Sequence, residues 1–94
     1  MRDYELVMIV SPEVEDDAVP ATVERVQQFI TERGGEVKEV TPWGRRRLAY
    51  AINRHREGSY VVAQLSLDPQ GLRALEDNLK LADDVIRHLL VKVE

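Results

Sequence analysis

Five arginines stand close together in the middle of this 94-residue sequence, between Trp43 and Tyr60. Only one acidic residue, Glu57, accompanies them, so the segment carries a local charge of +4 in a chain whose formal net charge is -4. Guanidinium groups bind phosphate with two parallel hydrogen bonds and stack on bases and aromatic rings. The segment therefore favours polyanion binding. Its arginines are Arg45, Arg46, Arg47, Arg54 and Arg56.

The competing interpretation is that these charges protect the edge of a sheet against aggregation. Such protection needs no particular sign of charge, and lysine would also provide it. The presence of five arginines against one acid therefore favours binding, but only modestly. Because successive strand residues point to opposite faces, Arg45 and Arg47 should share one face and Arg46 the other. Arg46 and Arg47 are the stronger candidates, since a strand fixes side-chain direction better than a hairpin tip, where Arg54 and Arg56 lie.

Enzyme chemistry finds little support in the sequence. The histidines His55 and His88 have no second metal ligand at helical spacing, no glycine-rich phosphate loop is present, and cysteine is absent. The acid pairs Asp16–Asp17 and Asp83–Asp84 fit a helix cap and a turn. We therefore expect no catalytic residue, no metal, no cofactor and no small-molecule substrate. A hydrolase of the acylphosphatase type would lack its nucleophile here.

Length and composition describe a globular chain, with 44% hydrophobic and 32% charged residues. A chain of this length buries only about two-thirds of its unfolded surface, so residues 1–94 are expected to form a single domain. Apolar runs such as Leu6–Val10 are too short to span a membrane, and the charged start does not resemble a signal peptide. The absence of cysteine fits a reducing compartment, so the expected location is the cytosol, with no membrane partner.

Hydrophobic periodicity predicts four strands and two helices. The third strand is expected to follow a hairpin loop, NRHREG, in which Gly58 is available for a positive φ. Asp16 or Asp17 should cap the first helix, and a bulge is expected near Gly44. The predicted elements are the strand Tyr4–Val10, the helix Val19–Arg33, the bulged strand 36–52, the strand Ser59–Leu67, a helix starting at Asp68–Pro69, and the strand Val85–Val93.

This β-α-β-β-α-β order is that of the ferredoxin-like split βαβ motif, an α+β fold. Its four-stranded antiparallel sheet has both helices on one face and the first and third strands at its centre. The helix-facing side is predicted to carry Tyr4, Leu6, Met8, Leu48, Tyr50, Val61, Ala63 and Leu65. The open side is predicted to carry Glu5, Val7, Ile9, Arg47, Ala49, Tyr60, Val62 and Gln64, with Arg87, Leu89 and Val91 from the last strand.

An open face that is half apolar predicts a protein partner that covers it. The RNA-recognition motif has the same topology, but it stacks bases on aromatic residues that alternate along its third strand. Here Tyr60 is followed by Val62 and Gln64, so base stacking across the sheet is not predicted. A ferredoxin-like regulatory or ligand-binding domain that dimerises through this face is the alternative function.

Three stretches of the chain are distinctive: MRDYELVMIV, VKEVTPWGRRRLAYAINRHREGSYVV and DDVIRHLLVKVE. With the predicted helix that Gly34–Gly35 should end between the first two, they resemble the bacterial small-subunit ribosomal protein S6 family, and the resemblance extends along essentially the whole chain. The resemblance implies a ferredoxin-like protein without catalytic activity. It further implies that the chain binds the central domain of 16S ribosomal RNA together with small-subunit ribosomal protein S18, in the cytoplasm.

Carried over by position, Arg2, Arg46, Arg47 and Arg87 match basic positions of the family, and Tyr4 and Tyr50 match aromatic ones. Many members continue past the position of Glu94 with a charged tail, so contact through such a tail is not expected here. The candidate RNA-binding or partner-binding residues are Arg2, Trp43, Arg45, Arg46, Arg47, Tyr50, Arg54, Arg56, Tyr60, Arg87 and Lys92.

Overall fold

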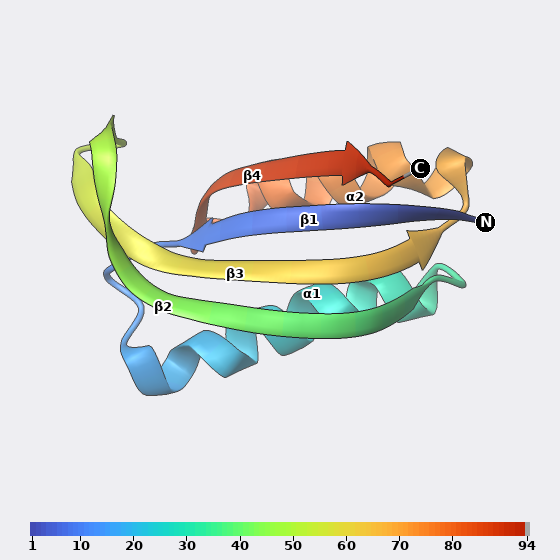
Figure 1. Ribbon diagram of the computed structural model, residues 1–94, viewed down its shortest axis with the longest axis horizontal. Coiled ribbons are helices and arrows are strands. Elements are labelled where there is room, and N and C mark those ends of the chain that lie inside the picture. The colour runs from blue at the N-terminus through green and yellow to red at the C-terminus, as the bar shows by residue number, and fades with distance from the viewer. Residues whose placement is uncertain (94) are drawn as a thin grey trace.

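Four strands and two α-helices make up residues 1–93, the part of the chain that the computed structural model describes (Figure 1). Glu94, after which no tail-mediated contact was expected, lies outside the described residues. The strand order β2-β3-β1-β4 confirms the ferredoxin-like topology with β1 and β3 at the centre. The elements are β1 (Arg2–Val10), α1 (Val19–Glu32), β2 (Glu36–Ile52), β3 (His55–Leu67), α2 (Leu72–Leu81) and β4 (Val85–Lys92).

Both helices cover the same face of the sheet, and the hydrophobic core fills the space between the two layers (Figure 1). Leu6 from β1, Leu65 from β3 and Leu75 from α2 are almost fully buried there, and burial of such side chains is the main force that holds the layers together. The predicted helix-facing residues Tyr4, Leu6, Met8, Val61, Ala63 and Leu65 are all part of this core. Neither α-helix within residues 1–93 has the length and apolar character needed to cross a membrane.

The C-terminal end of α1 lies close to its predicted position, whereas its N-terminal end differs from the prediction. The helix ends at Glu32, one residue before the predicted end at Arg33, and Gly34 follows with a φ of 81° and donates its N–H to the carbonyl of Thr31. The predicted cap by Asp16 or Asp17 is wrong, because these residues belong to a short 3-10 turn, and the helix starts after Ala18 without a side-chain cap.

The start of α2 differs in a similar way from the prediction. Asp68 accepts a hydrogen bond from the N–H of Gln70 at 2.9 Å, as a capping residue should. It caps a 3-10 turn, Pro69–Gly71, and the α-helix follows at Leu72. The predicted start at Asp68–Pro69 therefore marks the turn that leads into the helix.

The hairpin between β2 and β3 is longer than predicted, and its tip curves up and away from the rest of the sheet (Figure 1). The connection is the two-residue turn Asn53–Arg54, with φ values of 50° and 70°, which is the geometry that right-twisted hairpins prefer. The predicted loop at NRHREG and the positive φ at Gly58 are therefore wrong. Gly58 lies inside β3, where an added Cβ would come within 2.5 Å of Ile9 Cγ2.

The bulge predicted near Gly44 is confirmed, and it changes which side chains of β2 face which way. Gly44 has a φ of 84°, and the pairing with β3 shifts between Pro42 and Gly44. Beyond the bulge, Arg46 pairs with Gly58 and shares the open face with Tyr60, while Arg47 pairs with Glu57 on the other face. The prediction that Arg47 lies on the open face is therefore wrong.

Two further assignments on β2 are wrong for the same reason. Leu48 and Tyr50 were expected among the helix-facing residues, but both line a hollow on the open face. The expectation for β4 is confirmed, because its open-face residues pair with open-face residues of β1. These pairs are Arg87 with Ile9, Leu89 with Val7, and Val91 with Glu5.

Candidate nucleic-acid and partner interface

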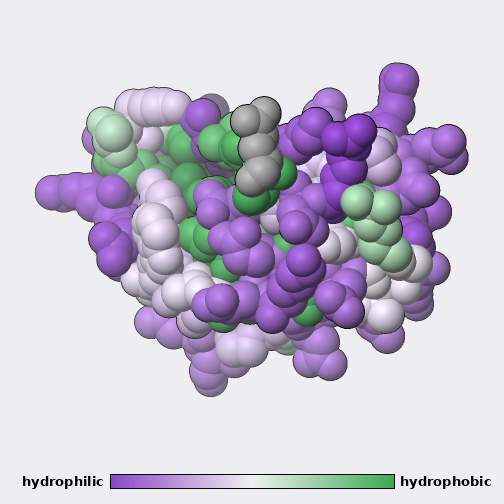
Figure 2. Space-filling view, turned by 45° about the vertical axis from the view of Figure 1, so that its right-hand side comes forward, coloured by the Kyte–Doolittle hydropathy of each residue, from purple (hydrophilic) through white to green (hydrophobic). Residues whose placement is uncertain are grey.

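An apolar hollow lies on the open face of the sheet, beneath the curved tip of the hairpin. Its volume is about 230 Å³, and β1, β2, β3 and β4 all contribute to its walls. Hydrophobic side chains gather around a hollow in the upper left of Figure 2, with hydrophilic ones at its rim. The main lining residues are Val7, Ile9, Leu48, Tyr50, Tyr60 and Arg87. The hollow is thus a place where a partner could bury apolar surface next to a positive charge.

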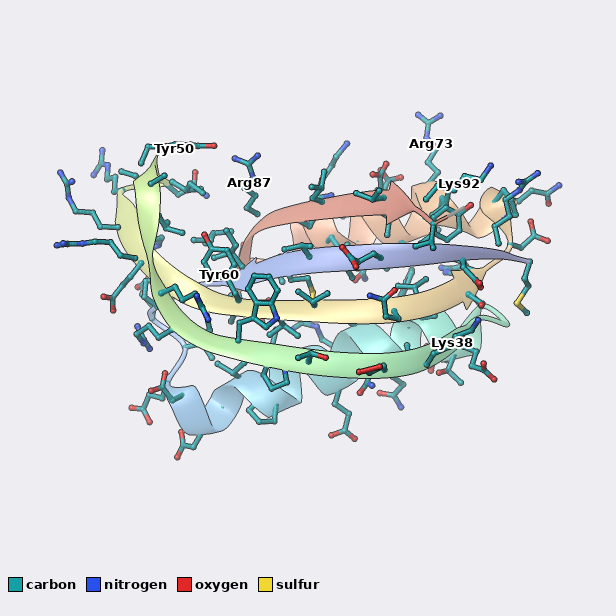
Figure 3. All side chains as sticks on the ribbon, viewed as in Figure 1. Lys38, Tyr50, Tyr60, Arg73, Arg87 and Lys92 are labelled. Atoms are coloured by element: carbon teal, nitrogen blue, oxygen red, sulfur yellow. The ribbon has the colours of Figure 1, made fainter. Side chains whose placement is uncertain are left out.

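Tyr50 and Arg87 meet across this hollow. Tyr50 comes from the hairpin and is 56% exposed, and Arg87 comes from β4. Arg87 Nη1 donates a hydrogen bond to the Tyr50 hydroxyl, and its guanidinium carbon lies 6.0 Å from the centre of the tyrosine ring. Figure 3 shows the two side chains approaching each other from the two elements. This contact ties the hairpin tip to the far edge of the sheet.

Trp43 and Tyr60 form a second aromatic feature on the open face. Their rings are stacked, with centroids 6.4 Å apart and an angle of 9° between the ring planes. The guanidinium carbon of Arg46 lies 5.5 Å from the Trp43 ring centre, and Arg46 Nε donates to the Trp43 carbonyl at 3.4 Å. Because Trp43 is at the bulge next to Gly44, it can turn toward Tyr60 on the neighbouring strand.

Sequence reasoning missed this aromatic pair. The test for base stacking considered aromatic residues that alternate along the third strand, where Tyr60 stands alone. The second ring comes from β2, and the bulge at Gly44 decides which face it occupies. A glycine directly after a tryptophan in an edge strand was the available signal, but without the pairing register it does not say which face the ring occupies.

The guanidinium group of Arg45 is hydrogen-bonded to other residues of the same chain. Its guanidinium donates five hydrogen bonds: two to Asp16 Oδ1, one to Glu57 Oε1, and one each to the carbonyls of Pro12 and Val14, at 2.9 to 3.3 Å. The carboxylates of Glu57 and Asp16 raise the pKa of Arg45 above its ordinary value. This side chain links the loop after β1 to the β2–β3 hairpin, and its donors are used for that purpose.

The other candidate cations are distributed over two regions. Within residues 1–93, four hairpin arginines are exposed and form no ion pair: Arg46, Arg47, Arg54 and Arg56. Arg2 and Lys92 lie together at the other end of the sheet, where they line a shallow surface depression with Met1 and Asp3. The structure therefore gathers most of the predicted site around the hairpin and the hollow, and leaves Arg2 and Lys92 apart from it.

Acidic groups occupy the end of the open face away from the hairpin. Asp3 accepts hydrogen bonds from Ser66 and, at 3.0 Å, from Lys38, and these bonds lower the pKa of its carboxyl group. Glu5 accepts a hydrogen bond from Gln64 at 2.8 Å. Arginine therefore predominates at the hairpin end of the open face, whereas the N-terminal end carries carboxylates, one of which is paired with Lys38.

The fold and the site together define a small α+β protein that presents one open, arginine-bearing sheet face to other molecules. The model of the family described as ribosomal protein S6 matches residues 3–92. The chain belongs to this family, a family of non-enzymatic structural proteins of the small ribosomal subunit, which confirms the predicted family, the ribosomal and cytoplasmic location, and the absence of catalysis. Membership also favours the ribosomal role over the regulatory alternative.

Individual relatives agree with the family match. The small ribosomal subunit protein bS6 of Moorella thermoacetica is 43% identical over 94 residues, which is all of this chain and 96% of the relative. The bS6 protein of an Exiguobacterium species is also 43% identical, over all of this chain and 99% of the relative. The crystal structure of 30S ribosomal protein S6 from Thermotoga maritima superposes with a TM-score of 0.91 at 33% identity, covering 98% of this chain and 87% of that one.

Proposed function

We propose that this chain binds the central domain of 16S ribosomal RNA jointly with small-subunit ribosomal protein S18. As a member of the S6 family, the chain is a protein of the small ribosomal subunit, and we propose these two molecules as its contacts there. The observation that carries the proposal is the set of exposed hairpin arginines without acidic partners, on a chain that is otherwise acidic.

The RNA contact is assigned to the hairpin. Arg46 and Arg47 are exposed on opposite faces of β2, and Arg54 and Arg56 extend the positive charge to the tip. Guanidinium groups with unused donors can form charge-assisted hydrogen bonds to phosphate at little desolvation cost. Phosphate contacts position a protein on RNA but do not read sequence, so specificity should come from RNA shape and from the partner.

The protein contact is assigned to the middle of the open face. Leu89 and Val91 on β4 are 54% and 44% exposed, and the apolar hollow adjoins them. Exposed apolar surface of this kind marks protein–protein contact in a soluble molecule. Glu5 and Glu39, which form no ion pair within residues 1–93, lie toward the N-terminal end of the face, where they would repel RNA and suit a basic protein. This gives the two partners separate regions of the sheet.

Filter binding to a central-domain RNA fragment tests this proposal. The chain alone should bind weakly and with strong salt dependence, and addition of S18 should raise the affinity. Arg46→Ala with Arg47→Ala should weaken the ternary complex about a hundredfold if both contacts are lost and about tenfold if one is, since each charge-assisted contact contributes about 1.5 kcal/mol or more. Equal affinity with and without S18 would count against joint binding.

A matched control removes the same amount of charge elsewhere. Arg73→Ala with Lys80→Ala takes two exposed cations from α2, and Figure 3 shows Arg73 pointing away from the body of the molecule. This double variant should leave the affinity nearly unchanged. If both double variants weaken binding equally, the contribution is one of net charge and the assignment to the hairpin is wrong.

A further inference from the structure

The stacked rings of Trp43 and Tyr60 form a flat, partly exposed aromatic surface at the hairpin end of the open face. A centroid distance of 6.4 Å is long for two nearly parallel rings, so the rings are strongly offset and neither covers the whole of the other. Trp43 is 51% exposed, and Tyr60 is half-buried. The pair therefore offers ring surface to an incoming planar group.

Core packing does not account for the position of Trp43. Large aromatic side chains contribute most to stability when they are buried, yet the only tryptophan of the chain is held at the surface. It is placed there by a bulge with a positive φ at Gly44, a conformation that a residue with a side chain adopts only under strain. The local backbone is thus arranged so that this ring lies on the open face.

The charges around the two rings are positive. Arg46 lies beside the Trp43 ring, and Arg87 lines the same hollow as Tyr60. The nearest acids on this face, Glu5 and Glu39, pair with Gln64, which lies four residues along β3 from Tyr60, or about 13 Å. Glu57 is closer in sequence but is bonded to Arg45 on the other side of the sheet.

We propose that the Trp43–Tyr60 pair is a stacking platform for one unpaired base of the bound RNA, with Arg46 or Arg87 contacting a phosphate of the same or the next nucleotide. The inference rests on the proposed RNA-binding function and names the chemistry of its contact. Aromatic rings stack on the base and guanidinium groups bind the phosphates of the backbone, and proteins that bind single-stranded nucleic acid combine these two contacts. An aromatic residue of a protein partner would use the rings and leave both guanidinium groups without an anion.

Trp43 is the sole tryptophan of the chain, so the tryptophan fluorescence of this protein reports on the platform. The experiment uses the full chain, S18 and the central-domain RNA fragment, and it records Trp43 fluorescence as each component is added. Stacking of a base should quench the emission when RNA is added to the two proteins. Ultraviolet irradiation of the ternary complex should then crosslink RNA to Trp43 or Tyr60, as identified by mass spectrometry of the peptide.

Two substitutions separate stacking from simple bulk. Trp43→Phe keeps an aromatic ring and should retain most of the affinity, whereas Trp43→Leu should weaken the ternary complex by about 5-fold to 150-fold, the range for loss of one stacked base. Phe29→Leu is the matched control, since Phe29 is also covered by an arginine, Arg33, but lies on α1 behind the sheet. It should leave RNA affinity unchanged, with thermal unfolding confirming that each variant is folded at the assay temperature.

Three results would overturn the inference. The Trp43 emission could change fully on addition of S18 alone and crosslink to that protein, which would make the platform part of the protein interface. Trp43→Leu could bind normally while the Arg46/Arg47 double variant binds poorly, which would refute the platform and leave the proposed function intact. Finally, the unmodified chain could fail to bind the RNA even with S18 present. In that case the proposed function itself fails, and the platform fails with it.

Discussion

Neighbouring arginines on β2 differ in what their guanidinium groups contact. Both residues are exposed, but the side chain of Arg45 keeps only 29% of its surface accessible and donates to two carboxylates and two carbonyls. Arg46 instead donates to the Trp43 carbonyl and lies beside the Trp43 ring. The alternation of strand side chains sends one toward the loop after β1 and the other toward the open face. The prediction that Arg45 binds RNA or a partner remains, but its donors already have acceptors, so its expected role is to position the hairpin.

Replacement of Arg45 tests that role. We expect Arg45→Ala to lower the thermal midpoint by several degrees, because Asp16 and Glu57 lose their common partner and the loop carbonyls lose a donor. Arg46→Ala, one residue away and with the same change of charge, should leave the midpoint nearly unchanged. Thermal unfolding followed by circular dichroism compares the two variants, and equal midpoints would show that Arg45 does not hold the hairpin in place.

Asp84 is the second residue whose contacts link distant parts of the chain. It stands just before β4 and accepts two hydrogen bonds from Arg25 of α1, at 2.7 and 2.8 Å, and one from Thr22 at 2.9 Å. The hydrogen bonds from Arg25 are the main reason that the pKa of Asp84 is lowered, with Thr22 adding to them. The pair fastens the first helix to the start of the last strand.

This lowered pKa has a definite effect on acid stability. A carboxyl group whose pKa is lower in the folded chain contributes stability above its unfolded pKa of about 3.9, and that stability is lost as the pH falls through the folded value. We expect Asp84→Asn to lower the free energy of unfolding at neutral pH by about 1 kcal/mol, and to flatten its decline below about pH 4. Asp83→Asn, next to it and exposed, is the control. Parallel pH profiles for Asp84→Asn and the unmodified chain, measured by urea unfolding, would refute this linkage.

The β2–β3 hairpin is the element on which the site depends. Its bulge at Gly44 places Trp43 on the open face, and its two-residue turn carries Arg54 at a φ of 70°. Between these points β3 must pass close to β1, and Gly58 makes that approach possible, because a Cβ there would meet Ile9 at 2.5 Å and the Val10 carbonyl at 3.0 Å. The glycine is required by proximity to β1, and its φ is negative.

Gly58→Ala should therefore force the hairpin away from β1. We expect a loss of about 1–3 kcal/mol in the free energy of unfolding, the usual range for an overpacked site, measured by denaturant titration. Gly71→Ala is the matched control, because its new methyl group would meet only the flexible side chain of Leu67, at 3.2 Å. If the two variants are equally stable, the close approach at Gly58 is relieved without cost and the hairpin is less constrained than proposed.

The same hairpin shows where sequence reasoning reaches its limit. Alternation and turn residues predicted the strands and the bulge, because each depends on local properties of the chain, and the order of the elements predicted the central position of β1 and β3. The predicted faces of Arg47, Leu48 and Tyr50 were wrong because the bulge shifts the pairing with β3, so that the residues after it exchange faces. The sequence does not show the size of this shift. The turn was misplaced because Asn53 and Arg54 adopt positive φ although a glycine was available at Gly58.

The candidate site was predictable in composition and not in arrangement. Charge alone identified the hairpin arginines, and the family resemblance implied that the polyanion is ribosomal RNA, which is what we propose. Neither could show that Arg45 is bonded internally, that Arg87 reaches Tyr50 from the far edge, or that Trp43 stacks on Tyr60, because these contacts join residues far apart in sequence or separated by the bulge. Side-chain contacts of this kind follow from the register of the sheet.

At the scale of the whole molecule, the described residues pack as one body around one core. Their radius of gyration is 12.8 Å, close to the value of about 12.4 Å expected for a compact domain of this length. Every strand and both α-helices contribute residues to, or pack against, the same hydrophobic cluster. We therefore propose that residues 1–94 form a single domain, as the length of the chain predicts.

A single core should unfold in a single step. We expect one calorimetric transition with an enthalpy of about 65 kcal/mol near 60 °C, and a calorimetric enthalpy equal to the van't Hoff enthalpy. The hairpin tip extends beyond the core, so its amide protons should exchange faster than those of β1 while the rest of the chain remains folded. A calorimetric enthalpy well above the van't Hoff value, or separate transitions for the hairpin and the core, would contradict the proposal. Because the hairpin carries most of the proposed RNA contacts, a hairpin transition below the temperature of the binding assay would also mean that those contacts are ordered only when RNA binds.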